Sequence, residues 1–333
     1  MDCNPFDKPF VAGGVEVPNR VVLAPVDGVY DQPCRTVYKD FGPGLTVSEM
    51  TTAQMVLHNR EKTVEHCMPA ATETPFAVQL SEKDPAMLHD SVQKLMEIFP
   101  DTGFFDLNLG CPAKPVVRGG RGVALMRDPG LAARLVAAMV RASSTPVSVK
   151  MRTGFLHGEP NAPEVAKACV DAGACLVTVH GRSFPQYFRG PINYEVIRQC
   201  VETVDVPVLA NGGITCLAEA RTMMQETGAA GVMIATGAFG NPWLLRQVLT
   251  NREDPPEVEE RFQVMQRHLA LAVAHMGVRR GVRRMRSHLA WYFKGLPEAA
   301  RHRLAMVHID DPQLLATFLD DYRRRVVEWQ STD

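Results

Sequence analysis

The chain has 333 residues, of which 46% are hydrophobic, and its formal net charge is −1. A chain of this length can bury the core of a large barrel and still supply a smaller second domain. The near-neutral charge excludes a uniformly basic nucleic-acid-binding surface, so any such surface must be local. The eight cysteines show no CxxC pair and no zinc-binding spacing, which predicts reduced cytoplasmic thiols and no metal.

The sequence also lacks the usual signals for export and membrane insertion. No basic segment followed by an apolar run opens the chain, and no stretch of about 18 uninterrupted apolar residues occurs. We therefore expect neither secretion nor a membrane span.

The first predicted element is a β-hairpin at about residues 8–18, which turns at two glycines and is suited to close the lower end of a barrel. Eight short β-branched runs bounded by Gly or Pro follow it. These candidate strands are 21–25, 45–50, 75–80, 104–110, 146–152, 176–182, 207–213 and 231–236. Helical patterns such as 84–99 and 129–142 separate most of them. The alternation predicts an α/β fold, a (β/α)8 TIM barrel over residues 1–250, rather than an open sheet with a GxGxxG turn.

The candidate strand 104–110 runs into the most informative motif of the chain. Asp106 and Asn108 alternate with apolar residues, and Gly110, Cys111 and a proline follow. Because alternate strand residues share a face, the polar pair is expected either to line a site, with the thiol at its edge, or to be fully hydrogen-bonded. A single cysteine is often only a small core residue, but a basic, glycine-rich segment beginning at Lys114 favours a functional role for Cys111.

Polar or glycine residues end nearly all the candidate strands, where barrel enzymes build their active sites. These strand ends are Pro25-Val26-Asp27, Glu49, Gln79, Asn108 with Cys111, Lys150 with Arg152, His180 with Arg182, Asn211-Gly212-Gly213 and Thr236-Gly237. Glycines after the last two strands allow backbone N–H groups to approach an anion, which predicts a phosphate-bearing cofactor. A cation at Lys150 could stabilise the negative charge of a reduced flavin.

From about residue 256 to 333 the pattern becomes helical only, which predicts a smaller all-α domain. One helix there has an apolar stripe and an opposite face with five arginines, at positions 279, 280, 283, 284 and 286. No acidic residue lies between them to form an i,i+4 pair, so we expect this face to contact RNA phosphates.

Taken together, these motifs resemble the tRNA-dihydrouridine synthases, and the resemblance covers nearly the whole chain. The matching segments are Leu23-Ala24-Pro25-x-x-Gly28-Val29-x-Asp31, Asp106-x-Asn108-x-Gly110-Cys111-Pro112-Ala113, Val149-Lys150-x-Arg152-x-Gly154, Val179-His180-Gly181-Arg182, Asn211-Gly212-x-Ile214 and Trp291-Tyr292-x-Lys294-Gly295-x-Pro297. Each segment is weak evidence alone, but the set in this order is specific.

The resemblance implies an FMN-bound barrel that uses NADPH to reduce uridine in tRNA to 5,6-dihydrouridine. Cys111 would donate a proton to C5 while hydride passes from flavin N5 to C6, and an ordinary thiol, with a pKa of about 8.5, can act as this acid. The FMN-binding residues would be Pro25, Val26, Asp27, Gln79, Lys150, His180, Asn211, Gly212, Gly213, Ala235 and Thr236. We expect RNA contacts from Asn108, Lys114, Arg182, Arg279, Arg283 and Arg286, and a cytoplasmic monomer.

Three positions depart from the family pattern. The family usually has Met at Val26, Asp at Gly213 and Gly-Arg at Ala235-Thr236, and the last change removes a cation expected at the flavin phosphate. Two alternatives remain open. A flavin barrel acting on a free small molecule would leave the arginine helix unexplained, whereas a flavin-free RNA-binding homologue would agree with Ala235-Thr236.

Overall fold

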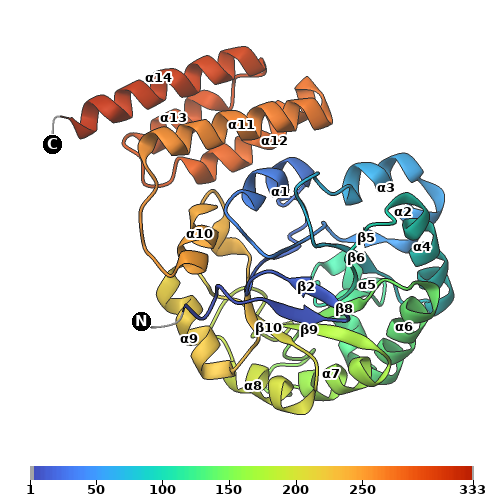
Figure 1. The fold of residues 1–333 in the computed structure, drawn as a ribbon. Coiled ribbons are helices and arrows are strands. Elements are labelled where there is room, and N and C mark those ends of the chain that lie inside the picture. The colour runs from blue at the N-terminus through green and yellow to red at the C-terminus, as the bar shows by residue number, and fades with distance from the viewer. Residues whose placement is uncertain (1–3, 332–333) are drawn as a thin grey trace.

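The computed structural model describes residues 4–331 and contains a closed barrel of eight parallel strands (Figure 1). The strands are β3 (Val21–Leu23), β4 (Leu45–Val47), β6 (Phe76–Ser81), β7 (Phe104–Leu109), β8 (Val147–Arg152), β9 (Ala174–His180), β10 (Val208–Asn211) and β11 (Gly231–Ile234). Their order is β4-β3-β11-β10-β9-β8-β7-β6, and pairing of β4 with β6 closes the barrel. The predicted fold class is therefore confirmed. Predictions that concern residues 1–3 or 332–333, including Cys3 and the outer domain ends, lie outside the described residues.

Several strands are shorter than the sequence suggested, because the local backbone leaves the ladder. The first strand stops before Pro25, which has no N–H to donate. Of the run 45–50, only Leu45–Val47 forms a strand (β4), and a separate short strand, β5 (Thr51–Thr52), follows the run. At the end of β10, Gly212 and Gly213 adopt positive φ angles and turn the chain out of the sheet.

Helices surround the barrel, and the predicted helices 84–99 and 129–142 appear with nearly the same bounds. The helices of the barrel unit are α1 (Gln32–Lys39), α2 (Ala53–His58), α3 (Arg60–Cys67), α4 (Pro85–Ile98), α5 (Lys114–Arg118), η1 (Gly122–Arg127), α6 (Pro129–Ala142), α7 (Ala162–Asp171), α8 (Tyr194–Thr203), α9 (Leu217–Thr227), η2 (Thr236–Ala238) and α10 (Trp243–Thr250). Both α4 and α6 begin with an Asp-Pro pair. The aspartate accepts hydrogen bonds from the first-turn N–H groups, and the proline occupies a position that needs no donor.

The N-terminal hairpin, β1 (Phe10–Ala12) and β2 (Val15–Val17), covers the amino-terminal end of the barrel. Phe10 and Val17 are buried in one cluster with inward-facing strand residues such as Phe104, Leu176 and Leu209. A second, larger cluster fills the space between the strands and the surrounding helices. The hairpin thus seals one end of the barrel, and the opposite end holds the carboxyl termini of the strands.

Four further helices pack beside α1 and α10 at one side of the barrel (Figure 1). They are α11 (Val258–Met276), α12 (Val278–Tyr292), α13 (Ala299–Met306) and α14 (Pro312–Gln330). A β-carbon on Gly281 would lie 2.6 Å from the carbonyl oxygen of Ala272, so glycine permits the close approach of α12 to α11. Within residues 4–331, no helix combines the length and the apolar composition needed to cross a membrane.

Candidate active site at the carboxyl end of the barrel

A buried polar network crosses β6, β7 and β8 inside the barrel. The side chain of Gln79 donates to Asp106 Oδ2 at 2.7 Å and accepts from Asn108 Nδ2 at 2.8 Å. Ser148 Oγ donates to Asp106 Oδ1 at 2.6 Å. Burial raises the pKa of the Asp106 carboxyl, while these two hydrogen bonds oppose the rise. The expectation that Asp106 and Asn108 line the interior is therefore met, and the network fixes the floor of the site.

Asn108 also positions the loop that carries Cys111. Its Oδ1 accepts from the backbone N–H of Gly110 at 3.1 Å and of Cys111 at 2.8 Å. Cys111 is half-buried, and burial raises the pKa of its thiol above the ordinary value. The thiol is thus protonated at neutral pH. Lys114 is exposed at the start of α5, three residues beyond Cys111.

Lys150, on β8, is joined to β10 through Asn211. Its Nζ donates to Asn211 Oδ1 at 3.1 Å, and Asn211 Nδ2 donates to the carbonyl of Met233 at 2.7 Å. Burial and the neighbouring Arg152 lower the pKa of Lys150 to about 8. A partly desolvated cation held in this way is suited to stabilise negative charge that develops beside it.

His180 and the two glycines after β10 form the next part of the rim. His180 is buried, and burial together with Lys150, Arg152 and Arg182 lowers the pKa of its imidazole well below 6.5, so the ring is neutral. Gly212 has a φ of 117°, and a β-carbon there would lie 2.6 Å from His180 Cδ2. Within the described residues, the backbone N–H groups of Gly212 and Gly213 make no hydrogen bond. They are free to bind an anion.

The ends of the first and last barrel strands are tied together near Ala235. Tyr30 Oη donates to the carbonyl of Ala235 at 2.8 Å. The carbonyl of Val26 accepts from the N–H of Tyr30 at 3.0 Å, which folds Pro25-Val26-Asp27 into a turn with Asp27 exposed. Thr236 is also exposed, at the start of η2. The structure therefore brings both predicted segments to the same rim.

Arg182, predicted as an RNA contact, lies beside the glycine rim. Its Nε donates to the carbonyl of Gly190 at 3.0 Å. Its Nη2 lies 3.8 Å from the position that a β-carbon on Gly213 would occupy. The guanidinium of Arg182, which follows β9, thus lies next to the end of β10.

Three of the five arginines on α12 form ion pairs with acidic residues, whereas the sequence predicted that none would. Arg284 pairs with Asp31 at 2.8 Å, Arg280 pairs with Glu65, and Arg286 pairs with Asp310 at 2.6 Å. These acids come from other segments, which a search for i,i+4 partners within the helix does not detect. Among the described residues, Arg279 and Arg283 alone of the five have no acidic partner, and both are exposed.

The three predicted RNA contacts on α12 therefore differ in whether an acidic residue already pairs with them. Arg279, Arg283 and Arg286 follow an i, i+4, i+7 spacing and line one surface hollow. However, the charge of Arg286 is offset by Asp310. Arg280 and Arg284 face the barrel instead and line a groove with Asp27 and Glu49 at the strand ends. The helix thus borders the mouth of the barrel with one side and solvent with the other.

Arg152 was predicted at a strand end but was given no role in the site, and Phe188 was not singled out from the sequence. Arg152, which is 2% exposed, donates to the carbonyl of Gly110 at 2.9 Å and to that of Tyr187 at 2.7 Å, so it supports the loop before Cys111. Strand alternation from Ser148 through Lys150 to Arg152 could have placed all three on one face. Phe188, 60% exposed and stacked on His180, carries no strand or helix signal that would have revealed it.

A closed (β/α)8 barrel with polar side chains gathered at the carboxyl ends of its strands has the architecture of a barrel enzyme. The family model described as "Dihydrouridine synthase (Dus)" matches residues 22–326. The chain belongs to this family, whose members are oxidoreductases.

Named relatives agree with this assignment, and a solved structure shares the fold. The chain is 39% identical over 308 residues to a probable tRNA-dihydrouridine synthase of Rickettsia bellii, covering 90% of this chain and 93% of that protein. It is 36% identical over 307 residues to tRNA-dihydrouridine synthase B of Pseudomonas aeruginosa, covering 90% and 91%. A solved structure of morphinone reductase shares the fold, with a TM-score of 0.56 and 14% identity over 77% of this chain and 92% of that one.

Proposed function

We propose that this protein reduces uridine to 5,6-dihydrouridine in tRNA, with FMN as the bound cofactor and NADPH as the reductant. The observation that carries the proposal is the placement of the Cys111 thiol, held in its protonated form by burial, at the mouth of the barrel. Family membership and the tRNA-dihydrouridine synthase relatives support it. We place the protein in the cytoplasm, as a monomer.

The strand-end residues fit a phosphate-bearing flavin. The free N–H groups of Gly212 and Gly213 are suited to bind the phosphate, with Thr236 beside them on the neighbouring strand end. Lys150 and Asn211 would lie along the ring system, with Gln79 and His180. Bound FMN supplies the hydride.

The residues of this chain supply the remaining steps. Cys111 holds the proton for C5 of the uracil ring, and Asn108 keeps the backbone of Cys111 in place. Arg152 supports the same loop from below through the carbonyl of Gly110. On α12, Arg279 and Arg283 offer two exposed cations for tRNA phosphates, in the surface hollow on the solvent side of the helix.

Incubation of the purified protein with unmodified tRNA and NADPH tests this proposal directly. We expect a flavin absorption spectrum from the protein and dihydrouridine in the nucleoside digest of the tRNA. A colourless protein that binds tRNA would support the flavin-free homologue instead. NADPH oxidation that depends on a small unsaturated carbonyl compound, with no dihydrouridine formed, would support the free small-molecule alternative.

The absence of arginine at Thr236 predicts weaker FMN binding than in arginine-bearing relatives. A charge-assisted hydrogen bond is worth about 1.5–3 kcal/mol, so Thr236→Arg should lower the FMN dissociation constant by about one to two powers of ten. Arg182→Ala should raise it, because the Arg182 guanidinium lies beside Gly213 and offsets part of the missing charge. Titration of the apoprotein with FMN measures both effects.

Arg198, an exposed arginine on α8 that pairs with Glu195 and Glu202, provides the matched control for Arg182. Arg198→Ala should leave the FMN dissociation constant unchanged. If Thr236→Arg has no effect or weakens binding, the phosphate does not lie beside Thr236, or no cation is missing there.

Replacing Arg279 and Arg283 together by alanine should weaken tRNA binding and flatten its salt dependence. Each lost phosphate contact should reduce the log–log salt slope by about 0.9 in duplex regions. Arg286→Ala should have a smaller effect, because Asp310 already neutralises that guanidinium. Binding isotherms at several salt concentrations give the slopes, and oxidation of NADPH by the bound flavin should not change. An equal slope for the double variant and the wild type would exclude this surface as a phosphate contact.

A further inference from the structure

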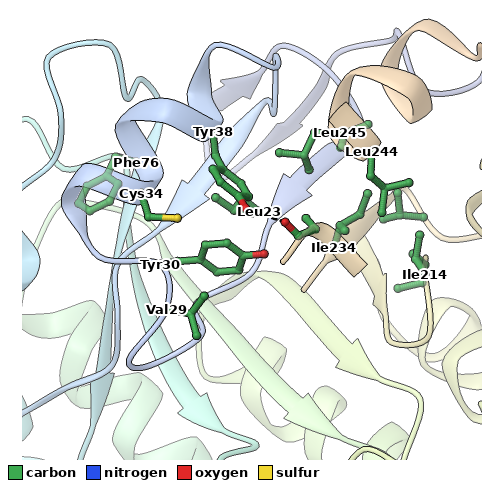
Figure 2. Packing of buried hydrophobic residues seen from close by; sticks show 14 of the residues in the cluster. Leu23, Val29, Tyr30, Cys34, Tyr38, Phe76, Ile214, Ile234, Leu244 and Leu245 are labelled. Carbon is green, nitrogen blue, oxygen red and sulfur yellow. Dashed lines mark hydrogen bonds between the residues drawn. The ribbon is translucent and has the colours of Figure 1, made fainter. Parts of the chain in front are cut away.

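Three potential metal ligands meet in the interior where the helical unit packs on the barrel. Cys34 lies on α1 of the barrel unit, His268 on α11 and His288 on α12, and each is at most 1% exposed. Their ligand atoms all lie within 4.8 Å of one another. Figure 2 shows Cys34 projecting from α1 among buried side chains that include Tyr30 and Tyr38. The cluster therefore joins two parts of the chain that are more than 200 residues apart in sequence.

The two imidazoles leave polar atoms unsatisfied in this buried position. His268 Nε2 and both ring nitrogens of His288 have no hydrogen-bond partner among the described residues. A neutral imidazole carries one donor and one acceptor, and buried groups of this kind are nearly always paired. One ring can offer only one nitrogen to an ion, so His268 Nε2 and one of the two His288 nitrogens, next to one thiol, point to a shared ligand.

The second nitrogen of His268 already has the partner expected of a metal ligand. His268 Nδ1 lies 3.2 Å from Tyr292 Oη. With its proton on Nδ1, the ring donates to Tyr292 and directs the lone pair of Nε2 into the cluster. Metal-binding histidines commonly use their other ring nitrogen in this way, which fixes the tautomer and the orientation of the ring.

We propose that Cys34, His268 and His288 bind one zinc-class transition-metal ion that fastens α11 and α12 to α1. One thiolate and two imidazoles are ligands that Zn²⁺ and Co²⁺ prefer, with water available for a fourth position. Bond lengths of about 2.0–2.1 Å for nitrogen and 2.3 Å for sulfur place tetrahedral ligands about 3.3–3.6 Å apart. From a separation of at most 4.8 Å, the side chains must therefore close by up to about 1.5 Å around the ion. As the metal–sulfur bond forms, the thiol releases one proton to solvent.

The local charges permit a dication at this position. Arg284 is the neighbouring cation, and it is already paired with Asp31, whose side chain also caps α1 by accepting from the N–H of Cys34 at 3.0 Å. The thiolate adds a second negative charge. Cysteine spacing could not reveal such a site, because its ligands come from three helices rather than from a CxxC pair.

Metal content of the flavin-loaded holoenzyme tests the proposal without reference to its activity. After removal of metal with a chelator and reconstitution with ZnCl2, we expect one zinc per chain in the wild type. Cys34→Ser and His288→Asn should each weaken zinc binding by more than the 10–100-fold that follows loss of an outer-shell partner. Cys169→Ser is the matched control, because Cys169 is an equally buried free cysteine on α7 of the barrel unit.

Cobalt binding by the wild type provides a second measurement, and its outcome does not depend on whether a variant folds. The wild type loaded with Co²⁺ should show a thiolate-to-cobalt charge-transfer band and release one proton per ion bound. A wild type that binds zinc only substoichiometrically, or binds cobalt without this band, would overturn the proposal. Full zinc retention by folded Cys34→Ser would overturn it equally, as would equal loss in Cys169→Ser. These readouts do not depend on uridine reduction, so the proposed function can fail while the metal site holds.

Discussion

Replacing Cys111 by alanine is expected to lower the rate of tRNA uridine reduction by a factor of about 10²–10⁴, the usual contribution of a positioned acid. A methyl group cannot deliver a proton, whereas the residues that would hold FMN are unchanged. The FMN content and the rate of flavin reduction by NADPH should therefore match the wild type. Single-turnover reduction of tRNA by the pre-reduced enzyme isolates the affected step.

Cys175 is the matched control for this experiment. It is also half-buried, and burial raises the pKa of its thiol to about 11, but it lies at the opposite, amino-terminal end of the barrel. Cys175→Ala should reduce tRNA at the wild-type rate. If Cys111→Ala does so as well, Cys111 is only a packing residue. Because burial raises the pKa of the Cys111 thiol above its ordinary value, deprotonation of this thiol should slow the wild type only at pH values above those at which a free cysteine ionises.

Replacing Arg35 by alanine is expected to cost about 3–5 kcal/mol of stability, the usual result of removing one partner from a buried ion pair. Arg35 and Glu73 have side chains that are 0% exposed and lie 2.9 Å apart. The same guanidinium donates to the carbonyls of Tyr30 at 3.0 Å and Met68 at 2.7 Å. Its loss leaves a buried carboxylate and two carbonyls without these partners. Denaturant unfolding of the apoprotein measures the change without a contribution from ligand binding.

The exposed pair of Arg280 and Glu65 provides the comparison. Their side chains are 65% and 34% exposed, and exposed pairs typically contribute no more than about 1 kcal/mol. Arg280→Ala should therefore change the unfolding free energy much less than Arg35→Ala. Equal losses for the two variants would show that burial does not govern the strength of these pairs.

The barrel was predictable because its signals are local. Each strand is a short β-branched run bounded by glycine or proline, and each carboxyl end must lie on the same rim once the barrel closes. The rim residues Lys150, His180 and Asn211 follow from that rule alone. The exact strand ends do not, since they depend on where ladder hydrogen bonds stop, as at Pro25 and Gly212.

Contacts between distant segments could not be predicted in the same way. Asp31 and Arg284 are far apart in sequence, and nothing near either residue identifies the other as its partner. For this reason the arginines of α12 were predicted to be unpaired, although their acidic partners lie on α3 and in the loops before α1 and α14. The same limitation concealed the cluster of Cys34, His268 and His288, whose members are brought together only by packing of α11 and α12 on the barrel.

Some arginines of α12 face the barrel and others face solvent. The contacts proposed for this helix therefore depend on its number of residues. Each residue turns an α-helix by about 100°, so one residue inserted between Gly281 and Arg283 would rotate Arg284 away from Asp31. The same rotation would move Arg283 off the solvent side. Gly281 packs against Ala272, so the part of the helix ahead of the insertion cannot rotate to compensate. Substitutions are thus far better tolerated here than insertions or deletions, and sequence divergence in α12 should proceed by exchange of side chains at constant length.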